Sequence, residues 1–456
     1  MISLAPLSTL VSTTERPPTH CVAFNEDRTE RSWYEFTRDV TTLSHQLTAL
    51  QEQKWALAFE DSYLFATAFL ALCHANKSII LPGNLQPGAL AELTEHYDGI
   101  LHDTRVTPPQ GVSAVSLPHT DALLEADNAP LQSFDNIHLT LFTSGSSGTP
   151  KAVEKSLFQL QQELNQLEQQ WGKQVHHATF FSTVSHQHIY GLLFRVLWPL
   201  CAGRPFMCSD LIYPEQVIAQ AKPDHVLVSS PALLKRLADQ TASGSYGAIY
   251  SSGGPLPHDA AKHSAIRLGE LPIEVYGSTE TGGIGFRQQD EESTPWRLFD
   301  GIQASLDAEG CLSLLSPYID PHNWYHTADI CDLINAQHFL LKGRADRVVK
   351  IEEKRVSLPE IEQRLCQNPW VIDAAALVLS QDDRQVIGAA VVLSAQGWKT
   401  LNSMGQGKFK LSMRQSLRAW LEPIAIPRQL RFVQHIPQNS QGKRQHPLIE
   451  ALFADQ

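Results

Sequence analysis

The residues best suited to chemistry stand in one short segment that is rich in serine and glycine. It reads Leu141-Phe-Thr-Ser-Gly-Ser-Ser-Gly-Thr-Pro-Lys151 and follows the β-rich stretch 137–142. Gly145 and Gly148 permit tight turns that expose backbone N–H groups. Further donors come from one ammonium group and four hydroxyls, on Lys151, Thr143, Ser144, Ser146 and Ser147. These groups could wrap a polyphosphate, and the strand before them and the Pro-Lys after them argue against a flexible linker.

This segment is not the phosphate-binding loop of P-loop enzymes. That loop requires the pattern G-x-x-x-x-G-K-[ST], whereas here Gly145 and Gly148 stand too close together and Pro150 precedes Lys151. The pattern therefore disfavours a P-loop kinase or ATPase.

Residues 143–151 resemble the phosphate loop of the acyl-adenylate-forming enzymes, a family that includes acyl-CoA synthetases, nonribosomal adenylation domains and luciferases. The family pattern T-S-G-S-[ST]-G-x-P-K is matched at every defined position, with Thr149 at the variable one. Further segments resemble family motifs, in the family's order, over roughly residues 140–445. The resemblance implies that the whole loop, from Thr143 to Lys151, binds the phosphates of ATP.

Two further segments resemble the parts of the family that surround the acyl group and the adenine. Ser185-His-Gln-His-Ile-Tyr-Gly191 is similar to the lining of the acyl pocket, and the resemblance assigns His188 and Gly191 to it. Ser251-Ser-Gly-Gly-Pro-Leu-Pro257 is similar to the loop on the adenine side, where Gly253 would contact the nucleotide and Ser252 the substrate.

The pair His186 and His188 also admits a metal site or a plain surface as explanations. Alternate spacing would place both side chains on one face of a strand, but the sequence suggests no third ligand, so a metal site is disfavoured. The segment also lacks the aspartate with which adenylation domains for α-amino acids usually hold the ammonium group. This absence disfavours an amino acid as the substrate.

The strand-like run 273–276 leads into Tyr276-Gly-Ser-Thr-Glu280, which resembles the family motif Y-G-x-T-E. The resemblance implies that Tyr276, followed by Gly277, stacks on adenine, and that Thr279 donates a hydrogen bond to a phosphate. It also makes Glu280 the ligand of Mg²⁺. A single carboxylate beside ATP is chemically sensible, because Mg²⁺ usually combines one or two carboxylates with phosphate oxygens.

The last third of the chain carries the remaining motifs. Asp329 ends a segment that resembles Y-x-T-G-D and would hold the ribose hydroxyls, although Ala328 replaces the usual glycine. Lys342-Gly-Arg-Ala-Asp346 resembles G-R-x-D, in which Arg344 would contact the nucleotide and Asp346 would be the hinge between domains. Asn439-Ser-Gln-Gly-Lys443 resembles S-x-G-K, which makes Lys443 the expected catalytic lysine.

One departure from the family bears on the second half-reaction. Residues 349–356 resemble the stretch K-I-x-G-x-R, but Glu353 stands where the family usually has glycine. In the family this strand lies beside the incoming pantetheine thiol. The carboxylate therefore raises the question of which acceptor collects the acyl group.

The chemistry explains why such residues are needed. A carboxylate is a poor electrophile, and its transfer to the α-phosphate of ATP creates a good leaving group. Because two anions must approach, the site needs cations and N–H donors, here Lys443, Thr279, Mg²⁺ at Glu280 and the loop 143–151. The predicted activity is ATP-dependent formation of acyl-AMP with release of pyrophosphate. The acyl group would then pass to the thiol of CoA or of the phosphopantetheine arm of an acyl carrier protein.

Within the family, the compact chain resembles the AMP-(fatty) acid ligases associated with acyl carrier proteins, so we expect an aryl or fatty acid as the small-molecule substrate. Two alternatives stay open. The chain could be a stand-alone amino-acid adenylation domain, which the missing aspartate disfavours. It could also be a nucleotide-binding homologue without catalysis, which the presence of both Lys443 and Glu280 disfavours.

The elements that must position these residues follow an α/β pattern. Helix-like spacing over 33–50, a strand at 55–59, a helix at 63–74 and a strand at 78–81 indicate an α/β sheet. Residues 157–171 predict a surface helix with a leucine stripe, and strands are expected at 225–229, 247–250 and 273–276. Short strands such as 312–315 and 338–342 suggest an antiparallel or barrel-like portion, and a capping box at 357–360 predicts a helix through Leu365.

Combined with the resemblance, this pattern predicts a large N-terminal domain, residues 1–343, of two αβ layers plus a small β-barrel portion. A small, mobile α+β domain would follow over residues 344–456, with the hinge at Asp346.

Composition limits the class of protein. The 456 residues include 43% hydrophobic and 18% charged residues, as in a folded globular chain of two or three domains. The net charge of −12 and the lack of a basic block disfavour nucleic-acid binding. No apolar run is long enough to span a bilayer, and no signal peptide is recognised. Seven scattered cysteines without C-x-x-C predict reduced thiols, mostly in the core, and a cytoplasmic location.

Overall fold

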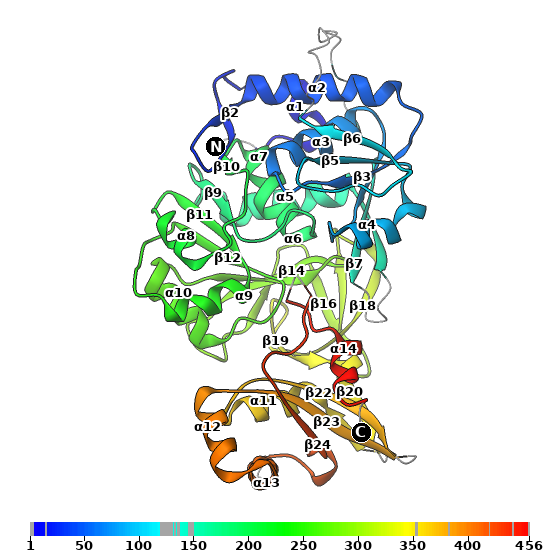
Figure 1. Ribbon diagram of the computed structural model, residues 1–456. Coiled ribbons are helices and arrows are strands. Elements are labelled where there is room, and N and C mark those ends of the chain that lie inside the picture. Colours follow the sequence, from blue (N-terminus) through cyan, green and yellow to red (C-terminus); the bar gives the residue numbers. More distant parts are fainter. Residues whose placement is uncertain are drawn as a thin grey trace. The chain divides into compact units, whose positions relative to one another are not determined.

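The computed structural model describes residues 4–13, 16–118, 131, 134, 137–144, 150–351, 354–381, 384–418, 420–439 and 442–454. The chain divides into two compact units (Figure 1). Unit 1 comprises Met1–Gln303 with Leu315–Trp324, and unit 2 comprises Ala304–Leu314 with Tyr325–Gln456. This division differs from the expected boundary between residues 343 and 344, which stays a prediction.

One sheet of unit 1 carries the strand that leads into the Ser/Gly segment. Its order is β6 (Ser113–Leu117), β5 (Gly99–Asp103), β3 (Lys54–Ala58), β4 (Ser78–Leu81), β7 (His138–Ser144) and β8 (Pro150–Ser156). Neighbouring strands are parallel except for β7 and β8, which are antiparallel. The predicted strands at 55–59 and 78–81 are confirmed, and their apolar runs are buried, as a sheet covered on both faces requires.

Two helices that are close in sequence pack against each other, and the second of them also packs on β3 and β4 of this sheet. Helix α2 (Trp33–Ala49) begins at a capping box, in which the Ser32 side chain accepts from the Glu35 amide and the Glu35 side chain accepts from the Ser32 amide. Helix α3 (Ser62–His74) is capped by Asp61. The rings of Phe36 and Tyr63 meet edge to face with centroids 5.8 Å apart. On the sheet, the short helix α4 (Pro87–Glu92) buries Leu90 against β3 and β4.

A second, larger sheet places the adenine-side and Y-G-S-T-E motifs. Its strands in unit 1 follow the order β15 (Trp296–Leu298), β14 (Gly282–Gln288), β13 (Ile273–Ser278), β12 (Ala248–Ser251), β11 (His225–Ser229), β9 (Thr179–Ser182), β10 (Phe206–Met207), β1 (Cys21–Phe24) and β2 (Glu30–Ser32). Strands β13 to β1 of this order pair in parallel. An apolar cluster joins one face of the sheet to the helices α8 (Pro214–Ala219), α9 (Pro231–Leu234) and α10 (His258–Leu268).

Helix α5 (Leu157–Trp171) has the predicted bounds but is more deeply packed than a surface helix. Its leucine stripe, Leu160, Leu164 and Leu167, is buried as expected. Glu163 and Gln166 are buried as well, with 4% and 8% of their surface exposed. The prediction of a surface helix is therefore wrong at these two residues, because polar residues on this helix face other parts of unit 1.

Unit 2 begins around a run of neighbouring strands, β16 (Gln303–Leu306), β17 (Cys311–Ser316), β18 (Asp320–Leu333) and β19 (His338–Arg344). Strands β18 and β19 are antiparallel. The predicted strands at 312–315 and 338–342 are thus confirmed, whereas a barrel-like closure stays a prediction. The hairpin β20 (Val348–Ile351) and β21 (Lys354–Ser357) follows.

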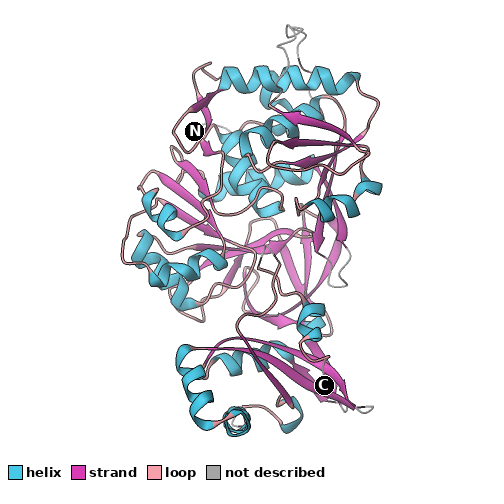
Figure 2. Cartoon of the chain, viewed as in Figure 1, coloured by secondary structure: helices cyan, strands magenta, loops and turns pink. Residues whose placement is uncertain are grey.

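The C-terminal part of unit 2 is an α+β arrangement with a core on both faces of a sheet (Figure 2). The sheet contains β22 (Val371–Gln381), β23 (Arg384–Leu393) and β24 (Gln429–Val433), with β24 parallel to β23. Helices α11 (Leu358–Cys366) and α13 (Gln406–Leu417) pack on one face, and α14 (His446–Ala451) packs on the other. Ser357 caps α11 through the Glu360 amide, as its sequence predicts.

The cysteines agree with the sequence prediction, since all seven are free and five of them are buried. Among the described helices, none combines the length and the apolar character that crossing a membrane requires.

Candidate active site

The Ser/Gly segment connects two antiparallel strands, β7 and β8. In their ladder Thr143 stands opposite Lys151, and the Thr143 hydroxyl donates to the Lys151 carbonyl at 3.5 Å. Ser144 pairs with Pro150 through the backbone. Gly145, Ser146, Ser147, Gly148 and Thr149 lie outside the described residues. The ladder nevertheless fixes the two ends of the loop, so that Lys151 starts a strand whose side chains alternate between exposed and buried positions.

The Y-G-S-T-E motif forms the end of β13 and a tight turn into β14. The turn needs glycine at two positions: a Cβ on Gly277 would lie 2.2 Å from the Gly282 carbonyl oxygen, and Gly282 has a φ of +67°. The Ser278 amide donates to the Thr281 hydroxyl at 2.9 Å, and the Thr281 amide donates back to the Ser278 hydroxyl at 3.2 Å. These reciprocal bonds close the turn and present Thr279 and Glu280, both partly exposed.

Strand β8 and this turn meet through an ion pair. The Lys151 ammonium lies 2.8 Å from Glu280 Oε1, with 58% of the lysine side chain and 26% of the glutamate side chain exposed. Burial acts to raise the pKa of Glu280, but hydrogen bonds from Lys151, from its own amide and from Ser278 outweigh it. The pKa of Glu280 therefore lies below its usual value, and the carboxylate is ionised near neutral pH. The structure thus brings together a predicted phosphate-binding cation and the predicted metal ligand.

Two residues that the sequence analysis did not single out lie behind this turn. Lys155, on β8, is buried, and its ammonium donates to the carbonyls of Glu280 at 3.1 Å and of Tyr318 at 3.0 Å. Glu163, on α5, is buried, and its Oε2 accepts from the Gly283 amide at 3.0 Å. The turn that carries Thr279 and Glu280 is consequently held through its backbone at two points, the Glu280 carbonyl and the Gly283 amide.

Burial perturbs both of these charges. It lowers the pKa of Lys155, which the nearby Glu163 and Glu280 partly offset. It raises the pKa of Glu163, which Lys155 and the Gly283 amide partly offset. Glu163 Oε1 is buried without a hydrogen-bond partner in the described part of the chain. A cation and a carboxyl group are therefore retained in a region where neither is well solvated.

A weak sequence signal for both residues existed. Lys155 stands two residues after the buried Val153 on β8, so that it shares its face in the strand. Glu163 stands three residues after Leu160 and four before Leu167, within the buried stripe of α5. Charged residues at core positions of amphipathic elements can be found from such periodicity, but their partners cannot.

The adenine-side loop follows β12. The Ser252 hydroxyl donates to the Val275 carbonyl at 2.8 Å, which ties the loop to the strand before Tyr276. Gly253 has a φ of +93°, a conformation that side chains disfavour. The Tyr276 ring packs against Trp296 at a centroid distance of 5.3 Å. The structure therefore groups Ser252, Gly253 and Tyr276 at the same ends of neighbouring strands.

The segment with His186 and His188 is a turn before the short helix α6 (Ile189–Gly191), so the expectation that both lie on one strand face is wrong. His186 is buried, and its two ring nitrogens lie 3.0 Å from the Ser62 hydroxyl and 3.0 Å from the Phe59 carbonyl. Both nitrogens are thus occupied, and burial lowers the pKa of His186 well below its usual value. No cluster of three or more metal-binding side chains exists among the described residues.

His188 and Gly191 differ from His186 in their setting. His188 is partly exposed, and a Cβ on Gly83 would lie 3.5 Å from its ring and 2.5 Å from the Phe142 carbonyl. His188 therefore lies close to the end of β7, where the Ser/Gly segment begins. A Cβ on Gly191 would lie 2.1 Å from the Ser185 carbonyl, so that only glycine permits this turn.

The remaining predicted residues belong to unit 2. Asp329 stands opposite Arg344 in the ladder of β18 and β19, and its amide donates to the Thr327 hydroxyl at 3.1 Å. The side chains of Arg344 and Asp346 lie outside the described set, as does Glu353. The pairing of Asp329 with Arg344 joins two positions that the sequence assigned separately to the nucleotide.

Lys443 is exposed at the end of a closed turn. Its amide donates to the Asn439 side chain at 2.9 Å, and the Asn439 amide donates to the Lys443 carbonyl at 2.8 Å. The next residue, Arg444, lies 2.9 Å from Glu362 and 2.6 Å from Asp373. Sequence reasoning missed this role of Arg444. Its ion pairs fix the backbone beside Lys443, and the Lys443 side chain stays exposed.

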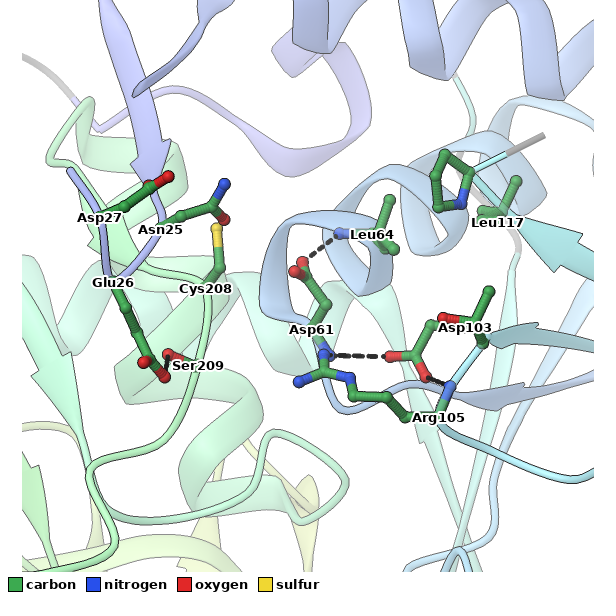
Figure 3. Close-up of a pocket in the computed structure, with 12 residues that line it drawn as sticks. Asn25, Glu26, Asp27, Asp61, Leu64, Asp103, Arg105, Leu117, Cys208 and Ser209 are labelled. Atoms are coloured by element: carbon green, nitrogen blue, oxygen red, sulfur yellow. Dashed lines mark hydrogen bonds and ion pairs between the residues drawn. The ribbon is translucent and has the colours of Figure 1, made fainter. Parts of the chain in front are cut away.

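A separate pocket in unit 1, with a volume of about 410 Å³, contains none of the predicted site residues (Figure 3). Three of its four carboxylates accept hydrogen bonds from backbone amides, and the fourth, that of Glu26, accepts from the Ser209 hydroxyl. Asp61 accepts from the amides of Tyr63 and Leu64, and Asp103 accepts from the amides of Glu60 and Asp61 and from Arg105. We interpret these acids as parts of the fold.

The fold and the motif residues define a nucleotide-binding α/β protein, and comparison with known proteins specifies it. The model of the AMP-binding enzyme family matches residues 11–302, and the model of its C-terminal domain matches residues 360–443. The chain belongs to this family of adenylate-forming enzymes, as its sequence predicted.

Two relatives show the range of this similarity. The chain is 28% identical to a 4-coumarate–CoA ligase from Rhodobacter capsulatus over 306 residues, which cover 66% of this chain and 73% of the relative. It is 27% identical to a D-alanine–D-alanyl carrier protein ligase from Staphylococcus aureus over 351 residues, 67% of this chain and 69% of the relative.

Solved structures share the fold over nearly the whole chain. ATP-bound MatB from Rhodopseudomonas palustris has a TM-score of 0.81 at 17% identity, covering 99% of each chain. A benzoate CoA ligase from Burkholderia xenovorans has a TM-score of 0.76 at 17% identity, covering 98% of this chain and 100% of the other. Membership of the family makes this protein an ATP-binding, AMP-forming acid ligase with a large N-terminal and a small C-terminal domain.

Proposed function

We propose that this protein activates an aryl or fatty acid as acyl-AMP, with release of pyrophosphate, and then transfers the acyl group to a thiol. The acceptor would be the phosphopantetheine arm of an acyl carrier protein, or CoA. The observation that carries the proposal is the turn of Thr279 and Glu280, fixed from behind by Lys155 and Glu163 and joined to Lys151 at 2.8 Å.

This arrangement fits the approach of two anions. The Lys151 cation and the amides and hydroxyls at the ends of the Ser/Gly loop would bind the phosphates, and Thr279 would donate to the α-phosphate. Because the turn is held through its backbone, these donors need little reorganisation as charge develops, which is the condition for strong electrostatic stabilisation. In this proposal Tyr276 and Gly277 face the adenine with Gly253, and His188, Gly191 and Ser252 border the acyl group.

The residues present fit a Mg²⁺ ion. Glu280 is ionised and partly exposed, and a single carboxylate together with phosphate oxygens is a common arrangement for this cation. When bound, Mg²⁺ would neutralise charge on the phosphates. Lys151 would then exchange its carboxylate partner for a phosphate oxygen.

Unit 2 would supply the remaining contacts. We propose that Asp329 holds the ribose hydroxyls, that Arg344 contacts the nucleotide and that Asp346 is the hinge. Lys443 would stabilise the negative charge shared by the carboxylate and the α-phosphate. Its exposed side chain next to the anchored Arg444 supports this role.

A two-stage screen tests the proposal. Pyrophosphate release is measured over a panel of fatty, hydroxy-fatty and aryl acids with ATP and Mg²⁺, and the best acid is then offered with CoA and with holo-carrier proteins. We expect pyrophosphate release to require an acid of one class. Continued turnover should require a thiol acceptor as well. ATP binding without pyrophosphate release for any acid would contradict the proposal and favour a non-catalytic homologue.

The role of Lys443 has its own test. Lys443→Ala should reduce adenylate formation by about 100-fold or more, while acyl transfer from supplied acyl-adenylate stays largely intact. Lys399→Ala, an exposed lysine on α12 (Ala395–Met404), is the matched control. Equal losses in both half-reactions would contradict the assignment.

Activation of an amino acid is a second candidate, because one relative is a D-alanine–D-alanyl carrier protein ligase. The acyl-pocket segment 185–191 carries no carboxylate for an ammonium group, which weighs against it. Pyrophosphate release with amino acids, and with no simple acid of the panel, would establish this candidate instead.

The acceptor depends on the region around Glu353. We propose that its carboxylate, in place of the usual glycine, favours a thiol presented by a protein over free CoA. Glu353→Gly should then improve the use of CoA relative to the carrier protein. Unchanged kinetics with both acceptors would show that this position does not select between them.

A further inference from the structure

A groove on the C-terminal part of unit 2 gathers positive charge in a protein whose net charge is −12. It lies between α13, the loop that follows and β24, whose ribbons run from orange toward red in Figure 1. Its volume is about 1000 Å³. Five of its twelve lining residues are cations and none is a carboxylate: Lys410, Arg414, Arg418, Arg428 and Arg431. We call this feature the basic groove.

The helix places three of the cations in one row. Lys410, Arg414 and Arg418 follow one another at intervals of four residues, the spacing that aligns side chains on one side of a helix. Arg428 directly precedes β24, and Arg431 is the middle residue of that strand. All five cations lie within residues 410–431, but other residues separate them, so the sequence contains no continuous basic block there.

Among the described residues, these charges have no ion-pair partner. In the described part of unit 2, no carboxylate lies within 4.0 Å of any of the five. Arg414 instead donates to the carbonyls of Pro427 and Arg428. Burial lowers the pKa of Lys410, and the charges of Arg431 and Arg414 lower it further. The cations therefore repel one another, and a bound anion would relieve this repulsion.

Apolar residues, most of them buried, lie among the cations. Leu421, Ile426 and Leu430 are buried there, and Phe453 lines the same groove. A groove of this volume with five cations along it suits a folded partner that offers several acidic side chains better than it suits a small free anion. An amphipathic helix with an acidic border has these properties.

We propose that the basic groove docks the acidic surface of the carrier protein whose phosphopantetheine arm accepts the acyl group. This inference rests on the proposed function and names the partner for its second step. Charge complementarity carries it: the groove concentrates uncompensated cations on an otherwise acidic chain, and such a patch raises the rate of encounter with an acidic partner.

The test is the double variant R418E/R428E. Both arginines are exposed, and neither side chain makes a hydrogen bond to a described residue, so the substitutions should not destabilise the fold. Lys408→Glu is the matched control, since Lys408 is exposed on the same helix but does not line the groove. Three reactions are compared: pyrophosphate release with acid alone, acyl transfer to free pantetheine, and acyl transfer to a purified holo-acyl carrier protein of net negative charge.

We expect the double variant to raise the KM for the carrier protein about tenfold or more, with less dependence on salt, while the other two reactions change by less than about twofold. Lys408→Glu should leave all three unchanged. Equal KM values for the carrier protein in wild type and double variant would overturn the proposal. Transfer to pantetheine or CoA without transfer to any carrier protein would also overturn it, while leaving the adenylation step standing.

Failure of the proposed function is distinguishable from failure of the docking site. If no acid supports pyrophosphate release, binding of the same holo-carrier protein is measured directly by titration calorimetry. Weaker binding by the double variant alone would still support the groove. Binding of a single-stranded DNA oligonucleotide by wild type, without binding of the carrier protein, would assign the groove to another partner and sink the proposal.

Discussion

Two charged regions of this protein are built on opposite principles. Around the turn of Thr279 and Glu280, every charge that matters has a protein partner: Lys151 meets Glu280, and Lys155 meets two carbonyls. In the basic groove, five cations share one surface with no carboxylate among the lining residues. Asp61 and Asp103 in the pocket of Figure 3 belong to the first type, because backbone amides donate to them.

This difference indicates what each charge is for. Paired charges at the turn fix a geometry before any ligand arrives, as catalysis by preorganised groups requires. In the groove Arg414 and Arg431 donate to backbone carbonyls, but no carboxylate among the lining residues balances the charge, so an acidic partner outside the chain is the natural explanation for it. Substitutions at the two regions should therefore differ in kind as well as in size.

The largest effect should come from Glu280→Gln. Pyrophosphate release should fall by about 100-fold or more, because the change removes the ionised carboxylate that meets Lys151 and would bind Mg²⁺. Stability should change by less than about 1 kcal/mol, since the pair is partly exposed. Glu292→Gln, at an exposed position, is the control. Near-normal activity of Glu280→Gln would contradict the role proposed for the paired charges at the turn.

Lys155→Met should destabilise the fold by about 2–4 kcal/mol, because two buried carbonyls lose their donor and Glu163 loses its neighbouring cation. Urea unfolding of the variant and of Lys173→Met, an exposed lysine beyond α5, measures this difference. The double variant K155M/E163Q should recover part of the loss. If Lys155→Met were as stable as the control, the buried charges would not position the turn.

The pairing of Lys151 with Glu280 should affect how stability and activity depend on pH. The folded pKa of Glu280 lies below its unfolded value of about 4.3, so the pairing stabilises the protein above that pH and is lost as pH falls through the folded pKa. The acid limb of kcat/KM for ATP should consequently lie below the ordinary glutamate range. Lys151→Met should move this limb to higher pH. A limb at the same pH in both proteins would contradict the pairing.

The smallest effect should be that of Lys410→Gln on stability. Removing one of several mutually repelling cations should change the free energy of unfolding by less than about 0.5 kcal/mol, or raise it slightly. Thermal unfolding at low and high salt measures this, and salt should narrow the difference from wild type. A loss of more than about 2 kcal/mol would mean that Lys410 has a structural role, and it would remove the contrast between the two regions.

Much of the fold and of the candidate site could be predicted from the sequence, because local rules govern those parts. Strand 225–229 and helix 157–171 have the expected bounds, since each combines a clear apolar period with a turn or capping residue at its end. The motifs were found by their resemblance to those of the family, and the structure shows that turns constrain the spacing of two of them. Gly277 and Gly191 show this directly, as a side chain at either would collide with a carbonyl.

Other features depended on contacts between distant segments. His186 and His188 looked equivalent in sequence, but a buried hydroxyl and a carbonyl occupy both ring nitrogens of His186, and His188 is partly exposed near the end of β7. The surface-helix prediction failed at Glu163 for the same reason, because its partner, the Gly283 amide, is 120 residues away. Periodicity shows which face of a helix is buried but does not show what covers it.

By itself the sequence determined the family, the nucleotide chemistry and the order of the motifs, because those are properties of short segments and their spacing. Only the tertiary structure decided that Lys155 and Glu163 hold the turn of Thr279 and Glu280, that Arg444 anchors the residue beside Lys443, and that five cations of residues 410–431 line one basic groove. The physical reason is that charge acts through space, so its meaning depends on which partners folding brings near and which it leaves absent.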